Sequence, residues 1–231
     1  MKLTAPVWLS LNAGYVDTAG FLALQGLFTA HVTGNFVTLG AALVLGSSGA
    51  LAKLLALPVF CVVIIVTRIC AQSLPKHGLP ILRTMLTLQV LLLILGAVMA
   101  IRTGAGGKGD DLATILTGMV LVAAMAIQNA ASRIHLASAP PTTLMTGTTT
   151  QIMIDIADLI RGLAPEAKAT AKARMSKMFA NVAGFALGCA GGAILYSQVS
   201  MWCFVVPPIL AALPILMHAT REDALPSRVP T

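Results

Sequence analysis

Two short polar stretches, each marked by a Thr-Gly pair, interrupt a sequence that is otherwise apolar enough for a membrane interior. Thr33-Gly34-Asn35 and, about half a chain later, Thr146-Gly147-Thr148 each open a short apolar segment of helical character. Threonine and asparagine side chains accept hydrogen bonds from the first free N–H groups of a helix, so Thr33 and Thr146 are predicted caps. A helix that starts inside a membrane directs those N–H groups at whatever lies in front of it. The pattern predicts two short helices whose N-termini form a solute-binding site near the membrane midplane.

Two ionisable side chains belong to the first half of this predicted site. Asp17 lies about eleven residues into the first apolar run, where a charged carboxylate is costly and is expected to face a cavity or a partner. A structural carboxylate bonded to a neighbouring helix is the alternative. His31 precedes the first Thr-Gly pair and could relay a proton near neutral pH. The alternative for His31 is a position at the outer interface, in contact with water or lipid headgroups.

The second half holds amides where the first half holds Asp17. With one gap allowed, Gln128-Asn129 matches its place, and such amides either contact a ligand or join helices by hydrogen bonds. The glycines of Gly184-x-x-x-Gly188 allow two helix backbones to approach closely. We expect that approach either between the two halves of the chain or in a homodimer.

The composition indicates a membrane protein made of several helices. Of the 231 residues, 57% are apolar and 10% are charged, with a mean hydropathy of +0.89, whereas soluble domains carry about 25% charged residues. The lipid bilayer is therefore the expected partner, and the net charge of +7 is assigned to cytoplasmic loops rather than to nucleic acid. The four cysteines show no CxxC spacing and no second histidine stands at ligand spacing, so neither a metal site nor a cofactor is expected.

The apolar runs predict an all-α bundle of six full spans and two short elements in a single domain, residues 1–231. The spans are expected at about Pro6–Leu24, Leu51–Leu74, Leu79–Ile101, Leu112–Ala131, Met178–Tyr196 and Met201–His218. The short elements, about Thr33–Leu45 and Thr146–Ile160, fall below the ~20 residues that a crossing requires. The order of spans and short elements in residues 6–101 recurs in residues 112–218, which predicts two repeats.

The distribution of charge favours six spans over eight. If both short elements crossed the membrane, Lys76, Arg83 and Arg133 would lie outside, against the positive-inside bias. If both are re-entrant, these residues lie in the cytoplasm with both termini and with the basic loop Arg161 to Lys177. Three spans in the first half then make the second half enter from the opposite side, so the repeats are predicted to be inverted.

Four ordered motifs resemble the YoaK-like family of bacterial inner-membrane proteins, which is classed as a domain of unknown function. They are Gly14-Tyr15-Val16-Asp17, Thr33-Gly34-Asn35, Gln128-Asn129-Ala130 and Met145-Thr146-Gly147-Thr148. The resemblance covers nearly the whole chain and implies a location in the inner (plasma) membrane. It implies no substrate.

These features favour a small-solute transporter or channel. The expected solute is small and either polar or anionic, because helix N-termini favour acceptor groups, and Asp17 suggests coupling to protons. A structural or regulatory membrane protein without transport activity is the alternative. An enzyme is not expected, because the sequence contains no recognisable nucleophile–base pair, metal motif or nucleotide loop.

Overall fold

The computed structural model describes residues 4–73, 79–104 and 111–222, and the side chains of 218–222 lie outside this description. Within these ranges every regular element is a helix, so the predicted all-α class is confirmed for the described chain. Several residues of the charge argument, such as Lys2, Lys76 and Arg228, lie outside the described ranges.

The helices follow the predicted order closely. They are α1 (Ala5–Ala23), α2 (Asn35–Leu45), α3 (Ala50–Ser73), α4 (Ile81–Thr103), α5 (Leu112–His135), α6 (Met145–Arg161), α7 (Pro165–Val199) and α8 (Val206–Glu222). Short 3-10 helices, η1 (Val32–Gly34) and η3 (Ser200–Val205), precede α2 and α8. Most predicted boundaries fall within a few residues of the observed ones, because long apolar runs leave few alternatives to helix.

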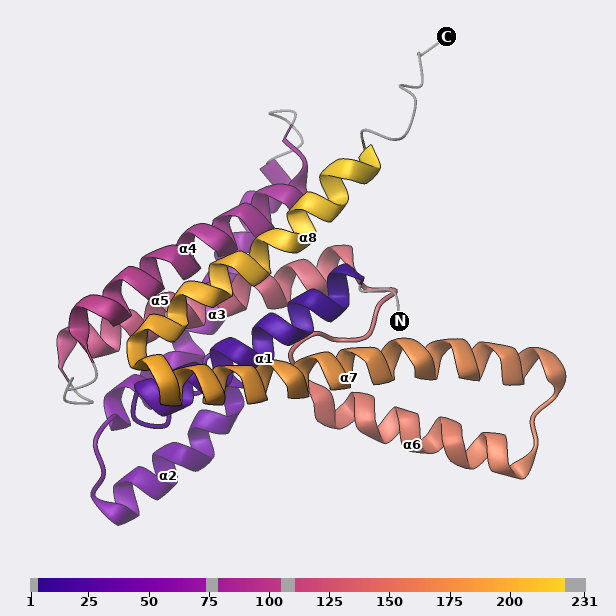
Figure 1. The fold of residues 1–231 in the computed structure, drawn as a ribbon, viewed down its shortest axis with the longest axis horizontal. Helices are drawn as coiled ribbons and strands as arrows, with labels where there is room; N and C mark the ends of the chain where they lie inside the picture. Colours follow the sequence, from indigo (N-terminus) through magenta and orange to yellow (C-terminus); the bar gives the residue numbers. More distant parts are fainter. Residues whose placement is uncertain (1–3, 74–78, 105–110, 223–231) are drawn as a thin grey trace, which may run out of the picture.

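Long helices from both halves of the chain pack together in a bundle. α1 packs against α7 and α8, α5 packs against α3 and α4, and α4 also packs against α8. In Figure 1, α1 begins and α8 ends on the right of the molecule, where α5 also ends, while the α7–α8 connection lies on the left. α1 and α7 run in the same direction, since Gly184, Gly188 and Gly192 of α7 lie against Val7, Leu11 and Tyr15 of α1 in turn.

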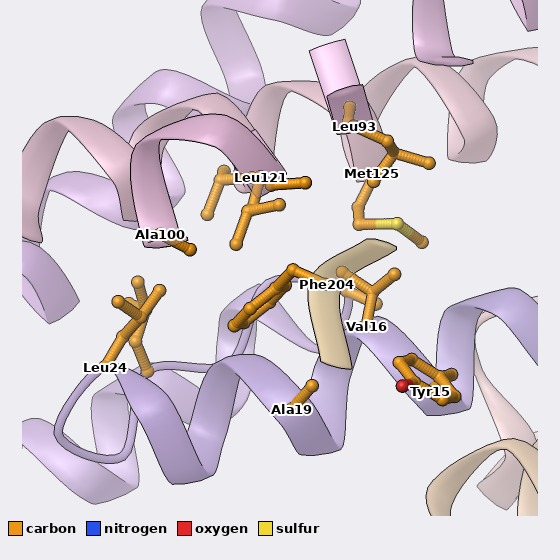
Figure 2. Close-up of a cluster of buried hydrophobic side chains, with 14 of the residues drawn as sticks. Tyr15, Val16, Ala19, Leu24, Leu93, Ala100, Leu121, Met125 and Phe204 are labelled. Carbon is orange, nitrogen blue, oxygen red and sulfur yellow. The ribbon is translucent and has the colours of Figure 1, made fainter. Parts of the chain in front are cut away.

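Phe204 of η3 lies at the centre of the largest apolar cluster. Figure 2 shows its ring between Val16 and Ala19 of α1 on one side and Leu121 of α5 on the other. All four side chains are buried. The turn between α7 and α8 thus joins the core of the bundle, which ties the last two long helices to α1 and α5.

The short helix α2 is too short to cross a membrane. Its 11 residues rise about 16 Å, roughly half of a 30 Å hydrocarbon core. It packs against α3, and its remaining surface is apolar and exposed, with Val44 86% exposed. A helix with so much exposed apolar surface is consistent with contact with lipid.

The helix α7 corrects the prediction of a basic loop from Arg161 to Lys177. It begins at Pro165 and continues for 35 residues, about 52 Å. The segment is rich in alanine, lysine and methionine, which are strong helix formers, and proline suits the first position of a helix. Its charges therefore lie on a helix. α6 lies beside the first part of α7, and Figure 1 shows this hairpin extending away from the other helices.

The long apolar helices are consistent with a membrane protein. Length and hydropathy qualify four stretches as candidate spans: Ala50–Ser73, Ile81–Thr103, Leu112–His135 and the combined stretch Pro165–Met217. α1 is not among these four. Its Asn12 and Asp17 make it more polar than the others. The count of six full spans with two short helices stays a prediction.

Candidate functional site

Asp17 anchors the segment that connects α1 to α2, residues 24–34, which we call the first linker. Its Oδ1 accepts hydrogen bonds from the backbone N–H groups of Thr29 at 2.8 Å and Ala30 at 2.7 Å, with that of His31 farther away at 3.4 Å. The carboxylate is buried. Asp17 thus engages backbone N–H groups of the first linker that precede the short helix.

His31 completes this cluster. Its Nδ1 lies 2.7 Å from Oδ2 of Asp17, close enough for the two groups to share a proton. The imidazole ring packs edge-on against Phe185 of α7 and Phe28, and about 29% of the side chain is exposed. The ring of His31 therefore contacts both the buried carboxylate of Asp17 and Phe185 of α7.

Asn35 closes the first linker into a loop. Its side-chain oxygen accepts the N–H of Phe28 at 2.9 Å, and its amide group donates to the carbonyl of Phe28 at 2.8 Å. The buried side chain of Asn35 thus forms hydrogen bonds with both the N–H and the carbonyl group of Phe28. Asn35 therefore shapes the linker.

The prediction that Thr33 caps the first short helix is wrong. The N-cap of α2 is Gly34, no side chain accepts a hydrogen bond there, and Thr33 is exposed. The preceding 3-10 turn satisfies the free N–H groups instead, because its i→i+3 bonds lead directly into the helix. A Cβ on Gly34 would lie 3.0 Å from the ring of Phe28, so this glycine makes room for its own linker.

A second polar cluster anchors the segment between α5 and α6, residues 136–144, which we call the second linker. Asn129 donates from Nδ2 to Oγ1 of Thr143 at 2.7 Å. One turn further along α5, the hydroxyl of Ser132 lies 2.9 Å from that of Thr142. Asn129 and Thr143 are fourteen positions apart, as are Asp17 and His31, so each linker is held by the helix that precedes it.

Gln128 joins α5 to two other helices and to the second linker. Its Oε1 accepts from Nε2 of Gln89 on α4 at 2.7 Å and from Nδ2 of Asn12 on α1 at 3.2 Å. Its Nε2 donates to the carbonyl of Leu9 at 2.8 Å, with Oγ1 of Thr142 at 3.4 Å. All four hydrogen-bonding positions of this buried amide are therefore engaged.

The same cluster contains buried oxygens without a donor. Among the described residues, no donor reaches Oδ1 of Asn12, Oε1 of Gln89 or Oγ of Ser10, and all three side chains are fully buried. A buried acceptor that lacks a donor costs about 1–3 kcal/mol. Such groups point to a place where another donor belongs.

The two polar clusters meet α1 within two turns of each other but on different faces, because five residues turn a helix by about 140°. Asn12 and Asp17 are five residues apart in this helix, a rise of about 7.5 Å. Within the described part of the chain no hydrogen bond joins the two linkers directly. The predicted proximity of the two Thr-Gly elements stays a prediction. Both linkers are held by side chains next to the middle of α1.

The second Thr-Gly element also differs from its predicted role. α6 begins at Met145 after the N-cap Leu144, which has no side-chain hydrogen bond, so Thr146 lies in the first turn. Thr148 donates its hydroxyl to the carbonyl of Leu144 and does not accept from an N–H group. A Cβ on Gly147 would contact nothing within 4 Å. Thr146 is therefore not the cap, and no close approach requires Gly147.

Gly184 and Gly188 lie at the interface between α7 and α1. A Cβ on Gly188 would lie 2.0 Å from the carbonyl oxygen of Leu11, and one on Gly184 would lie 3.1 Å from that of Val7. These glycines are buried inside one chain, which fits the first of their two predicted uses. A homodimer stays a prediction, and these two positions are inaccessible to it while α1 covers them.

Two cavities flank the second linker and share Ala139. The smaller, about 170 Å³, is lined by Asn129, Ser132, Arg133 and Thr142 among others. The larger, about 530 Å³, lies between the linker and α7. Asn129 therefore borders one of these cavities, whereas Asp17 lines neither of them.

Several residues of these clusters were not selected from the sequence. Gln89 stands alone in an apolar run, and Asn12 precedes Asp17 in a polar stretch of α1. Uncharged amides inside apolar helices are a recognisable signal for interhelical hydrogen bonds. Their meeting at Gln128 depends on tertiary packing, which the spacing of the residues does not reveal.

Comparison with known proteins identifies a family without a described activity. The model of the family described as "Protein of unknown function (DUF1275)" matches residues 6–217. The match confirms the YoaK-like resemblance, since that family is DUF1275. No curated protein and no solved structure matches the chain.

Proposed function

We propose a function for this chain from its own polar clusters, because it belongs to the DUF1275 family, whose description names no activity. The protein acts as a small-solute transporter of the inner (plasma) membrane. The solute site lies beside the middle of α1, between the cluster of Asp17 and His31 and the cluster of Asn12, Gln89 and Gln128. Two inverted repeats, residues 6–101 and 112–218, form the two sides of the transport pathway.

The pairing of the helices supports the two repeats. In the two predicted repeats, α1 corresponds to α5, α3 to α7 and α4 to α8. Replacing each helix by its counterpart turns the observed α1–α7 contact into the α5–α3 contact, which is also observed. In the same way, the observed α1–α8 contact corresponds to the observed α5–α4 contact, and the α4–α8 contact corresponds to itself. A two-fold relation between the halves would give this pattern, and inverted repeats with interrupted helices are common in transporters.

The observation that carries the proposal is the matched anchoring of the two linkers. One linker from each half bonds to a polar side chain fourteen positions earlier, Asp17 in one half and Asn129 in the other. Non-helical backbone at membrane depth is tolerated where protein or a water-filled pathway surrounds it. Two such linkers that approach the middle of α1 from opposite ends of the bundle support a pathway gated from each side.

The free acceptors support a solute that donates hydrogen bonds. Asn12 and Gln89 present buried oxygens without a donor, whereas the N–H groups of the first linker are already bonded to Asp17. A neutral polar solute with O–H or N–H groups suits these acceptors better than an anion. His31 and Asp17 then provide a proton-sharing pair beside the solute.

A membrane protein without transport activity is the second candidate. The observation that favours it is that both oxygens of Asp17 are engaged within the protein. In that case the polar clusters only hold the linkers in place. The two candidates differ in whether the acceptors of Asn12 and Gln89 bind a solute.

Solute flux into liposomes tests the proposal. Vesicles containing the purified protein should take up at least one small neutral polar solute, from a panel of polyols, amides and amino acids, severalfold faster than protein-free vesicles. Gln89→Leu should reduce that flux at least tenfold. Thermal stability should fall only slightly, because leucine of similar size leaves no cavity and Oε1 of Gln128, which loses the bond from Gln89, still accepts from Asn12. Lys172→Gln, on the exposed surface of α7, is the control and should leave flux unchanged.

Two outcomes would contradict this proposal at different points. Uptake no faster than in protein-free vesicles for every solute would remove the transport function. If Gln89→Leu transports the solute as fast as the wild type, the transport function stands but the solute does not bind at Gln89.

Labelling of introduced cysteines tests the orientation. In a variant without the four native cysteines, Ser47→Cys between α2 and α3 should react with a membrane-impermeant reagent from outside the cell. Ala164→Cys, at the turn between α6 and α7, should react only after the membrane is opened, because the six-span arrangement leaves that turn in the cytoplasm. Equal reaction of both positions in intact cells would place them on the same side of the membrane and contradict the six-span arrangement.

A further inference from the structure

The cavity of about 530 Å³ beside the second linker lies outside the proposed solute site. It is bordered by Ser138 from the linker and by Thr170, Arg174 and Lys177 from α7. The three α7 residues are spaced so that they share one face of the helix. None of the lining residues is acidic, so the cavity presents two cationic groups and two hydroxyl groups to whatever enters it.

Arg174 is oriented by a buried carboxylate behind it. Its Nε donates to Oδ2 of Asp155 at 3.0 Å, and Nη2 donates to Oδ1 of the same residue. Asp155 is only 1% exposed and also accepts from Nε2 of Gln151 at 2.9 Å. The Arg174 guanidinium holds the pKa of Asp155 below its usual range, so both partners are charged at neutral pH. A guanidinium has five N–H donors, and those not used by Asp155 remain for another acceptor.

Lys177 adds a second positive charge to the cavity between α7 and the second linker. Among the described residues its ammonium group forms no ion pair, and it lies two turns from Thr170 on the same face. The hydroxyl of Thr170 already donates to the carbonyl of Glu166 at 3.1 Å. An arginine fixed by a carboxylate, a lysine and the hydroxyl of Ser138 form a set of donors that matches the acceptor oxygens of a phosphate group. A purely structural role for the Arg174–Asp155 pair would not explain the second cationic group, Lys177, on the same cavity.

We propose that this cavity binds a phosphate group. The group belongs either to an anionic lipid headgroup or to a free phosphorylated solute, because both present the same oxygens to the cavity. In the six-span arrangement, α7 enters the membrane near Met178, so the cavity lies at the cytoplasmic surface, where anionic headgroups are available. The proposal does not depend on transport, and a protein that carries no solute could still bind phosphate here.

Thermal unfolding of the full-length, delipidated protein tests the site. Inorganic phosphate and, separately, phosphatidylglycerol in nanodiscs of otherwise neutral lipid are the two probes. At least one should raise the unfolding temperature of the wild type by a few degrees, since a ligand that binds only the folded state stabilises it. Lys177→Gln should weaken the apparent affinity about tenfold, the loss expected for one charge-assisted contact. Lys172→Gln, exposed on the same helix but not lining the cavity, should behave as wild type.

The probe that stabilises the protein identifies the source of the phosphate group. Stabilisation by inorganic phosphate indicates a soluble ligand, and stabilisation by phosphatidylglycerol alone indicates a headgroup. Three results would overturn the proposal: no stabilisation by either probe, equal stabilisation by chloride at the same ionic strength, or equal weakening by Lys177→Gln and Lys172→Gln.

Discussion

Replacing Asp17 with alanine should lower the unfolding temperature of the purified protein sharply and abolish solute flux. The substitution removes the acceptor of the Thr29 and Ala30 N–H groups, at 2.8 and 2.7 Å, and the partner of His31. An unsatisfied buried donor costs about 1–3 kcal/mol, so two of them cost roughly 2–6 kcal/mol. The first linker should then leave its place against α1.

Asp17→Asn is the matched control for this prediction. The asparagine oxygen can still accept from the backbone of the first linker, so most of the thermal stability should remain. Its amide cannot share a proton with His31 in the way a carboxylate can, so proton movement should be lost. Equal stability of Asp17→Ala and wild type would show that Asp17 does not hold the linker.

Replacing Gly188 with leucine should prevent the protein from folding into a homogeneous species. A Cβ at this position would lie 2.0 Å from the carbonyl oxygen of Leu11, and one at Gly14 would lie 2.1 Å from that of Phe185. The obstructing atoms are backbone atoms, so α1 and α7 would have to separate. The cost should exceed the 1–3 kcal/mol that is typical of an overpacked core, where side chains can yield. Size-exclusion chromatography in detergent should show aggregated protein or none.

Gly147→Ala provides the comparison for Gly188. Nothing lies within 4 Å of the added Cβ, and alanine favours helix over glycine, so this variant should be neutral or slightly stabilised. Recovery of monodisperse Gly188→Leu with the unfolding temperature of the wild type would contradict the close approach of α1 and α7. Aggregation of Gly147→Ala would contradict the open space around Gly147.

The sequence was informative where a physical constraint acts on a local pattern. Apolar runs of sufficient length predicted most of the long helices to within a few residues, whereas α7 begins 13 residues before its predicted start. A carboxylate deep in an apolar run, Asp17, and an amide in the corresponding place, Asn129, were recognised as residues that need partners. The cost of leaving such groups unpaired does not depend on the details of packing.

The details that were missed depend on competition between local alternatives or on contacts between distant segments. Thr33 and Thr146 resemble caps, but a 3-10 turn and an earlier helix start satisfy the N–H groups in other ways. The charged first part of α7 was predicted to be a loop because of its charge, but the helix propensity of its alanine, lysine and methionine residues makes it helical. The meeting of Asn12, Gln89 and Gln128 joins three helices, and no local pattern encodes it.

Simultaneous recording of solute uptake and internal pH in liposomes tests the transport proposal most directly. Wild-type protein should take up the permeating solute identified from the panel, and the internal pH should fall as the solute enters. Asp17→Asn should uncouple the two signals, because the proton-sharing pair with His31 is lost while the first linker remains anchored. Uptake by the wild type no faster than in protein-free vesicles would contradict transport. Uptake that is independent of pH and survives Asp17→Asn would contradict the role of Asp17 in proton coupling.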